Sequence, residues 1–352
     1  MRAVAAVSVA VTHIEQIKTT NGLPNASDLP FFVHTGGHIG VVLFFVLSGF
    51  LITLLLLREL ESTGRISYKD FYARRILRIW PLYYFILIAT AVLWSYQPSW
   101  LTALLCFTIL PNVAHVADIG WVPSPPVWSI GVEEQFYLVW PLVVFLFRKS
   151  LLPLLMVFIV GYTLLPHALL VGLNGLDGDH AGTMRFIDRF FYFVKFNCMA
   201  VGAVLAILYI KGFRLTLGGK PLVTVMVVAV PLVLWFSGFH TKVLTEELYA
   251  GLFAIVILHI ASLSKLPRLI DNGLLNYLGR ISYGIYMYHY TVGLLCALLI
   301  QKLGFTTETF YINAIMYGLV MAGTIVISAL SYRYFESYFL SLKKRFQQAI
   351  SF

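Results

Sequence analysis

The chain has 352 residues, of which 59% are hydrophobic and only 12% are charged. Ordinary soluble domains are roughly 45–50% apolar and about 25% charged, so this composition excludes a soluble enzyme, a disordered chain and a nucleic-acid binder. The formal net charge of +9 is typical of a membrane protein whose cytoplasmic loops are rich in Lys and Arg. The composition therefore predicts an all-α integral membrane protein.

Ten apolar runs approach the length that crosses a bilayer, about 17–25 residues. They lie near residues 2–18, 37–57, 79–96, 130–147, 151–173, 190–210, 221–238, 246–262, 276–300 and 311–335. A further run near 100–114 is shorter and ends at Pro111 and Asn112, which indicates a re-entrant or interfacial segment. We therefore predict a bundle of about ten transmembrane helices with one additional short segment.

The basic residues decide the orientation of this bundle. If the N-terminus is cytoplasmic and the 100–114 run does not cross, 19 Lys and Arg residues face the cytoplasm and five face outward. This asymmetry predicts that both termini are cytoplasmic. We expect residues 1–340 to form one transmembrane domain and residues 341–352 a short basic cytoplasmic tail. The polar outer loop 174–189 is expected to contribute to the choice of a hydrophilic substrate.

The first run carries a basic residue at its start, Arg2, and an ionisable residue at membrane depth, His13. Eleven residues are nearly three helical turns, so the two side chains project from one face about 16 Å apart. Ionisable groups inside a membrane are usually functional, and a histidine can move protons near neutral pH. A core histidine bonded to a neighbouring helix is the structural alternative, and the spacing leaves both interpretations open.

The stretch FYARRILRIWP, residues 71–81, contains a second candidate pair. Arg75 and Arg78 are one helical turn apart and face the same side, whereas Arg74 points elsewhere. Paired guanidinium groups suit phosphate or pyrophosphate. A cluster that grips anionic lipid head groups is the alternative, and charge alone favours it.

Two adjacent carboxylates, Glu133 and Glu134, lie in the stretch WSIGVEEQFYLVWP at the predicted outer end of an apolar helix. Neighbouring helical residues point about 100° apart, so we expect only one carboxylate to reach a shared site. It could orient a histidine or pair with an arginine. A favourable interaction with the helix dipole is the alternative, but two carboxylates at membrane depth favour a function.

Two further stretches have simpler interpretations. Ser48 and Gly49 in FFVLSGFLI predict a close approach between helices. Ser282, Tyr286 and His289 in LGRISYGIYMYHY share one helix face, and packing explains this arrangement. The remaining histidines have no spacing typical of a metal site, so we expect no metal.

Taken together, these stretches resemble membrane-bound acyltransferase family 3, the integral membrane O-acyltransferases that modify bacterial surface polysaccharides and related acceptors. The matching stretches occur in the family's order along the chain: RAVAAVSVAVTH, FFVLSGFLIT, FYARRILRIWPLYY, WSIGVEEQFYLVWPL and LGRISYGIYMYH. The resemblance implies an acyl-CoA donor, usually acetyl-CoA, that binds from the cytoplasmic side. It also implies an acceptor hydroxyl on a glycan or lipid-linked sugar, and a protein embedded among the lipids of the bacterial inner membrane.

The resemblance also implies roles for the candidate residues. Arg2 and His13 match the family's Arg-x10-His pair, and His13 would act as general base or carry the acyl group transiently. The implied donor-binding residues are Arg2, Arg75 and Arg78, and the implied catalytic residues are His13, Glu133 and Glu134.

A multipass transporter or flippase for a glycan or lipid-linked substrate is the competing hypothesis. Such a protein would carry charged residues along a substrate path that opens to each side of the membrane in turn. It would also have helices broken by Gly or Pro at corresponding positions in the two halves of the chain. The sequence contains no such pairing of broken helices, so the acyltransferase is the preferred prediction.

Overall fold

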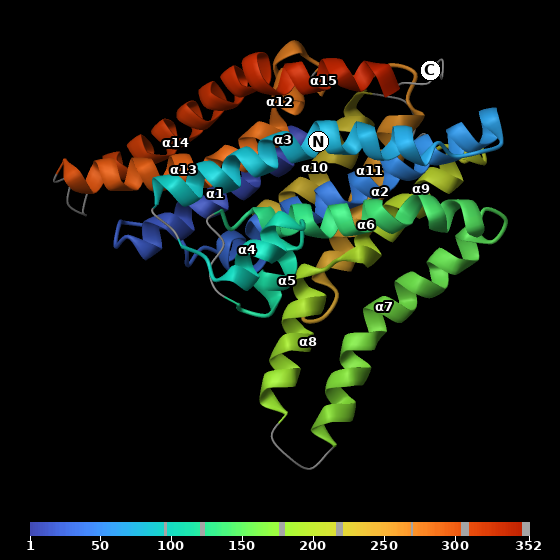
Figure 1. The fold of residues 1–352 in the computed structure, drawn as a ribbon, viewed down its shortest axis with the longest axis horizontal. Helices are drawn as coiled ribbons and strands as arrows, with labels where there is room; N and C mark the ends of the chain where they lie inside the picture. The colour runs from blue at the N-terminus through green and yellow to red at the C-terminus, as the bar shows by residue number, and fades with distance from the viewer. Residues whose placement is uncertain are drawn as a thin grey trace. The chain divides into compact units, whose positions relative to one another are not determined.

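The computed structural model describes residues 1–94, 97–119, 124–175, 180–215, 221–268, 270–303 and 310–346. These parts of the chain are helical and contain no strand (Figure 1). The chain divides into two compact units. The first unit comprises Met1–Phe44, Lys69–Ser95 and Thr216–Ala349, and the second comprises Phe45–Tyr68, Tyr96–Leu215 and Ile350–Phe352. The predicted all-α class is confirmed.

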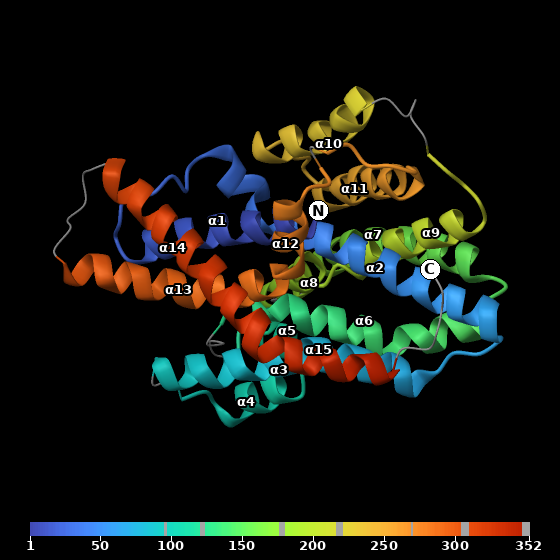
Figure 2. The same ribbon diagram turned by 90° about the horizontal axis from the view of Figure 1, so that it is seen from above.

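The first unit holds α1 and the C-terminal helices. Its elements are α1 (Arg2–Thr20), η1 (Phe31–Thr35), the start of α2 (Gly36–Thr63), α3 (Tyr68–Leu93), α10 (Pro221–Phe236), α11 (Thr245–Ser262), α12 (Gly273–Arg280), α13 (Ser282–Lys302), α14 (Phe310–Ser331), η2 (Tyr332–Glu336), α15 (Ser337–Lys343) and η3 (Lys344–Phe346). Helix α1 packs along α13, and α14 packs against both (Figures 1 and 2). This packing places α1 inside the unit.

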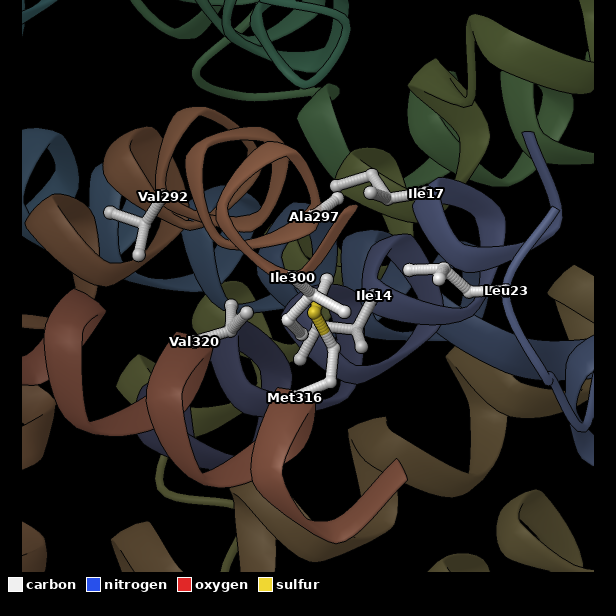
Figure 3. Packing of buried hydrophobic residues seen from close by; sticks show 8 residues of the cluster. All are labelled: Ile14, Ile17, Leu23, Val292, Ala297, Ile300, Met316 and Val320. Atoms are coloured by element: carbon white, nitrogen blue, oxygen red, sulfur yellow. The ribbon is translucent and has the colours of Figure 1, made fainter. Parts of the chain in front are cut away.

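Small and branched apolar residues explain why α1 can lie in the interior. Its first half is rich in alanine, the best helix former, and these side chains are buried. Its second half contributes to a cluster with α13 and α14 (Figure 3): Ile14, Ile17, Leu23, Val292, Ala297, Ile300, Met316 and Val320. Lipid tails are as apolar as these residues, so the association depends on close packing rather than on exclusion of water.

The second unit holds the rest of α2 and the central helices. Its further elements are α4 (Trp100–Phe107), α5 (Pro111–Val116), α6 (Val127–Leu146), α7 (Leu151–Asn174), α8 (Ala181–Phe193) and α9 (Phe196–Ile210). Figure 1 shows α7 and α8 as an antiparallel pair. Only 6% of the most apolar window of α7 is buried, at a mean hydropathy of 2.2. An apolar helix that is exposed on nearly all sides is suited to contact with lipid.

Eight helical stretches in the described parts of the chain are long and apolar enough to cross a membrane. They are Phe31–Thr63, Tyr68–Leu93, Val127–Leu146, Leu151–Asn174, Ala181–Ile210, Thr245–Ser262, Ser282–Lys302 and Asn313–Lys343. Two of the ten predicted runs are helices that fall outside this set. Helix α10 is apolar but has only 16 residues, and α1 carries Glu15 and Lys18 in its second half.

The 100–114 run folds as two short helices, α4 and α5, rather than as one long helix. They have eight and six residues, or about 12 and 9 Å of length, so neither crosses a bilayer alone. Ile109 turns the chain between them with a φ of 59°. Asn112 and Gln135 exchange side-chain hydrogen bonds of 3.2 and 2.9 Å, which join α5 to α6.

Candidate functional site

His13 and His289 form a hydrogen-bonded pair between α1 and α13. The Nδ1 atom of His13 lies 2.8 Å from Nε2 of His289, and the Nδ1 atom of His289 lies 3.1 Å from the carbonyl oxygen of Ile285. A carbonyl can only accept, so His289 carries its hydrogen on Nδ1 and accepts on Nε2. His13 must then donate from Nδ1, and its Nε2 has a lone pair. This chain of hydrogen bonds assigns both tautomers.

The surroundings of the pair restrict the His13 ring. His289 is 1% exposed, whereas His13 is partly exposed. The Tyr290 ring meets His13 edge-on, with ring centroids 5.6 Å apart and an interplanar angle of 88°. Sequence reasoning attributed His289 to packing, and only the pairing of α1 with α13 shows its contact with His13. A partly open, oriented imidazole is able to accept a proton from a bound molecule.

A buried ion pair anchors α1 beyond His13. Glu15 and Lys18 are 1% and 2% exposed, and the Lys18 ammonium contacts Glu15 Oε1. Tyr317 of α14 donates its hydroxyl hydrogen to the same oxygen at 2.6 Å, and the Ala26 amide donates to Glu15 Oε2. Buried charges are tolerated when they are paired and hydrogen-bonded in this way. The cluster therefore connects α1 to α14 and to the loop that follows α1.

Three arginines line a cavity of about 370 Å³ at the other end of α1. Arg2 comes from α1, Arg78 from α3 and Arg280 from α12, and the Glu336 carboxylate lies in the same wall. The neutral lining includes Asn276 and the tyrosines Tyr283 and Tyr332. The residues fit a ligand with several phosphate groups, because guanidinium forks bind phosphate oxygens in pairs.

The predicted pair Arg75 and Arg78 lies one turn apart on α3, and of the two only Arg78 lines the cavity. Arg78 lines the cavity with Arg2, whereas the guanidinium of Arg75 lies over the Phe71 ring, 5.8 Å from its centroid. Arg74, expected to point elsewhere, donates to the carbonyl oxygen of Phe346 at 2.7 Å. The structure thus places two of the three predicted donor-binding arginines at one cavity.

A π-helical turn, η2, builds the acidic side of this cavity. The wider turn places both Tyr332 and Glu336 in the lining. The hydroxyl of Ser331 donates to Glu336 at 3.2 Å, and Tyr288 donates to Ser331 at 3.0 Å. Single π turns inside α-helices often occur at functional sites, and this one fixes a carboxylate that is 8% exposed.

Glu133 and Glu134 belong to the second unit, whereas the histidine pair and the arginine cavity belong to the first. Glu133 accepts hydrogen bonds from Ser48 at 2.9 Å and from Tyr137 at 3.0 Å, one at each carboxylate oxygen. No acidic residue lies in the first turn of α6, so the helix dipole does not account for either carboxylate. Glu133 is therefore a fixed acceptor in the second turn of α6.

The predicted close approach at Ser48 and Gly49 is confirmed within the second unit. A Cβ atom on Gly49 would lie 1.9 Å from the carbonyl oxygen of Met199, and one on Gly202 would lie 2.1 Å from that of Val46. Both distances are far shorter than any non-bonded contact that a real Cβ atom makes. Helices α2 and α9 therefore cross with backbone against backbone, as small residues permit.

Part of the predicted outer loop 174–189 lies outside the described residues, at 176–179. The rest includes most of α8, and Arg189 in the second half of this helix contacts the carbonyl oxygen of His115 and lies 3.6 Å from Asp118. Burial and the Arg189 guanidinium lower the pKa of His115 below its ordinary value, and the Asp118 carboxylate opposes this shift. These contacts attach α8 to α5. In the described part of the chain, no group of three or more His, Cys, Asp or Glu is arranged to hold a metal ion.

The apolar helices define a multipass membrane protein, and the first unit carries a histidine pair and a cavity suited to an anionic ligand. The sequence profile of the acyltransferase domain (Acyl_transf_3) matches residues 1–333. The chain belongs to this acyltransferase family, which confirms the resemblance in its motifs.

Two relatives show what this chain is similar to. The "Peptidoglycan O-acetyltransferase OatA" of Listeria monocytogenes is 28% identical over 343 residues, which cover 89% of this chain and 53% of that protein. The "Putative O-acetyltransferase SACOL0978" of Staphylococcus aureus is 25% identical over 342 residues, with 87% of this chain and 53% of that protein covered. The chain thus spans about half the length of these curated relatives. No solved structure matches it.

Proposed function

We propose that this chain transfers an acyl group from acyl-CoA to a hydroxyl of a glycan or lipid-linked sugar, and that the acyl group is acetyl. The family and the names of the relatives support acyl transfer to a glycan. The single observation that carries the mechanism is the hydrogen bond from His13 to His289. It presents Nε2 of His13 as the acceptor nitrogen of a partly exposed imidazole, which is the form a general base requires.

The chemistry follows from this tautomer. The Nε2 atom of His13 takes the proton of the acceptor hydroxyl while the hydroxyl oxygen attacks the thioester carbonyl. The carbon–sulfur bond then breaks, and His13 returns the proton to the leaving thiolate. His289 accepts the Nδ1 hydrogen of His13 throughout, so it holds the ring and stabilises the charge that His13 acquires. In an alternative route, Nε2 attacks the thioester carbonyl first and the carbon–sulfur bond breaks to release the CoA thiolate. The acceptor hydroxyl then takes the acyl group from His13, and its proton goes to the thiolate.

The arginine cavity is the proposed site for the phosphates of the donor. Arg2 and His13 lie eleven residues apart on α1, a rise of about 16 Å. Arg2 and Arg78 would hold the phosphates, while an extended arm reaches along α1 toward the histidine pair. Arg75, one turn before Arg78, would add positive charge nearby rather than line the cavity itself.

Glu133 is the proposed acidic residue of the reaction, with Glu134 as its neighbour in the family motif. Both oxygens of Glu133 are held by hydroxyl donors, so its carboxylate has a defined direction. We propose that it orients a reacting group rather than serving only the packing of α6.

We infer that α1 and α10 complete a bundle of ten transmembrane helices and that both termini are cytoplasmic. The distribution of Lys and Arg supports this orientation, and it places the arginine cavity on the cytoplasmic side, where acyl-CoA is available. The 100–114 segment then lies at the outer side as a re-entrant or interfacial element. Residues 1–340 would be the acyltransferase domain of a bacterial inner membrane protein, followed by a basic tail at 341–352.

The test is donor binding and acyl transfer by the full chain purified in detergent. We expect the wild type to bind acetyl-CoA and to transfer radiolabelled acetyl groups to a glycan acceptor. His13→Ala should keep donor binding and lose transfer, whereas Arg78→Ala should lose donor binding. A well-folded wild type that binds no acetyl-CoA would contradict the proposal and favour the transporter hypothesis.

A further inference from the structure

Arg280 is the last residue of α12, a short and strongly amphipathic helix. The Asn272 side chain caps this helix by accepting a hydrogen bond from the Leu275 amide at 2.9 Å. Arg280 lies in the last turn, where a cation is favoured by the helix dipole. This capped helix brings Arg280 to the lining of the cavity described above.

The charges around this cavity specify the kind of ligand it can hold. Arg2, Arg78 and Arg280 come from three different helices, and the cavity wall contains one carboxylate, that of Glu336. The charged side chains of the lining, three arginines and one glutamate, therefore sum to +2. A ligand with a single negative charge can engage only part of this charge, whereas a ligand with several phosphate groups can contact each guanidinium.

We propose that Arg280 is a third phosphate-binding residue of the donor site and that it favours a donor with more than one phosphate group. This inference rests on the proposed function, because the ligand is taken to be the acyl donor. Arg280 comes from α12, whereas Arg2 and Arg78 come from α1 and α3, so three separate helices each bring a guanidinium group to the cavity. A nucleotide-type acyl thioester fits this arrangement better than an acyl phosphate does.

A lipid head group is the other source of phosphate chemistry near the end of a helix. An arginine that only anchors α12 to anionic lipid needs no shared cavity. Arg280 instead shares its cavity with Arg2 of α1, with Arg78 of α3 and with a carboxylate that is 8% exposed. Although Arg280 is exposed, its place in this shared lining favours the donor over the lipid.

The experiment measures binding of CoA to the full chain by calorimetry, in detergent and in nanodiscs with or without phosphatidylglycerol. The variants are Arg280→Ala, Arg280→Lys and the control Arg268→Ala, which removes an exposed arginine that does not line the cavity. Loss of a charge-assisted contact should weaken CoA binding by about tenfold or more. Arg280→Lys should retain part of the affinity, Arg268→Ala should match the wild type, and acetyl phosphate should bind far more weakly than CoA.

The outcomes separate this inference from the proposed function. If the wild type binds CoA and Arg280→Ala binds it equally well, the role of Arg280 is refuted and the proposed function stands. If the effect of Arg280→Ala occurs only in nanodiscs with anionic lipid, Arg280 binds lipid and the inference is wrong. If the folded wild type binds no CoA, the proposed donor itself is refuted. Thermal unfolding of each variant shows that the protein remains folded.

Discussion

Replacing His289 tests whether the histidine pair is functional or only structural. The contact to be removed is the 2.8 Å hydrogen bond from Nδ1 of His13. While His13 is neutral, such a bond contributes about 0.5–1.5 kcal/mol, and once His13 holds the proton it becomes charge-assisted and contributes about 1.5–3 kcal/mol. The difference, about 1–1.5 kcal/mol, stabilises the transition state and corresponds to roughly five- to twelvefold in rate.

Loss of the tautomer adds to this effect. Without His289, the Nδ1 hydrogen of His13 has no fixed acceptor, so the ring can place its hydrogen on Nε2 and become unable to accept a proton there. We therefore expect His289→Ala to lower kcat by at least about tenfold, with the KM for acetyl-CoA unchanged. His289→Gln should recover part of the rate, because its amide oxygen can accept the same hydrogen bond.

The assay is the release of CoA thiol from acetyl-CoA in the presence of a glycan acceptor. His259→Ala is the matched control, since His259 is also fully buried and is bonded to Thr224 of a neighbouring helix at 3.0 Å. The control should lower the thermal unfolding temperature without lowering kcat of the folded fraction. A wild-type kcat in folded His289→Ala, or a loss confined to KM, would refute the reasoning.

Three further substitutions test other parts of the structure. Glu133→Gln should lower kcat by at least about tenfold and cost only about 0.5–1.5 kcal/mol of stability, because the amide keeps the size of the side chain but has one acceptor oxygen for the two hydroxyl donors; full activity would exclude a catalytic role. Tyr317→Phe should cost about 1.5–3 kcal/mol of stability, since a buried carboxylate loses a donor, and an unchanged unfolding temperature would contradict this. Gly49→Ala should cost at least about 1–3 kcal/mol, since its Cβ would overlap a backbone carbonyl; a wild-type unfolding temperature would mean that the helices do not cross there.

The helical class was predictable because a membrane-spanning run needs only length and apolar composition, which a sequence displays directly. The close approach at Gly49 was also predictable, since a glycine in a long apolar helix lets the backbone of a neighbouring helix come close. The division of the 100–114 run into two short helices was harder to predict. The turn between them depends on Ile109 in a left-handed conformation, and no glycine marks it.

The site was predictable only in part because its partners are distant in sequence. Spacing within α1 identified His13 and Arg2, but His289 is 276 residues from His13, and helical periodicity does not report such a contact. The same holds for Arg280, whose place beside Arg2 and Arg78 depends on how α12 packs in the fold. Helical spacing placed Arg75 and Arg78 one turn apart, but which of the two lines the cavity depends on side-chain packing, since the Arg75 guanidinium lies over the Phe71 ring.

The most direct test of the central claim is the rate of acceptor-dependent thiol release from acetyl-CoA by His13→Ala beside His259→Ala. The general-base role predicts a loss of about 10²–10⁴ in kcat for His13→Ala, with CoA binding retained and with the His259→Ala rate close to that of the wild type. A His13→Ala protein that is folded, binds CoA and still transfers acetyl groups at the wild-type rate would contradict the account.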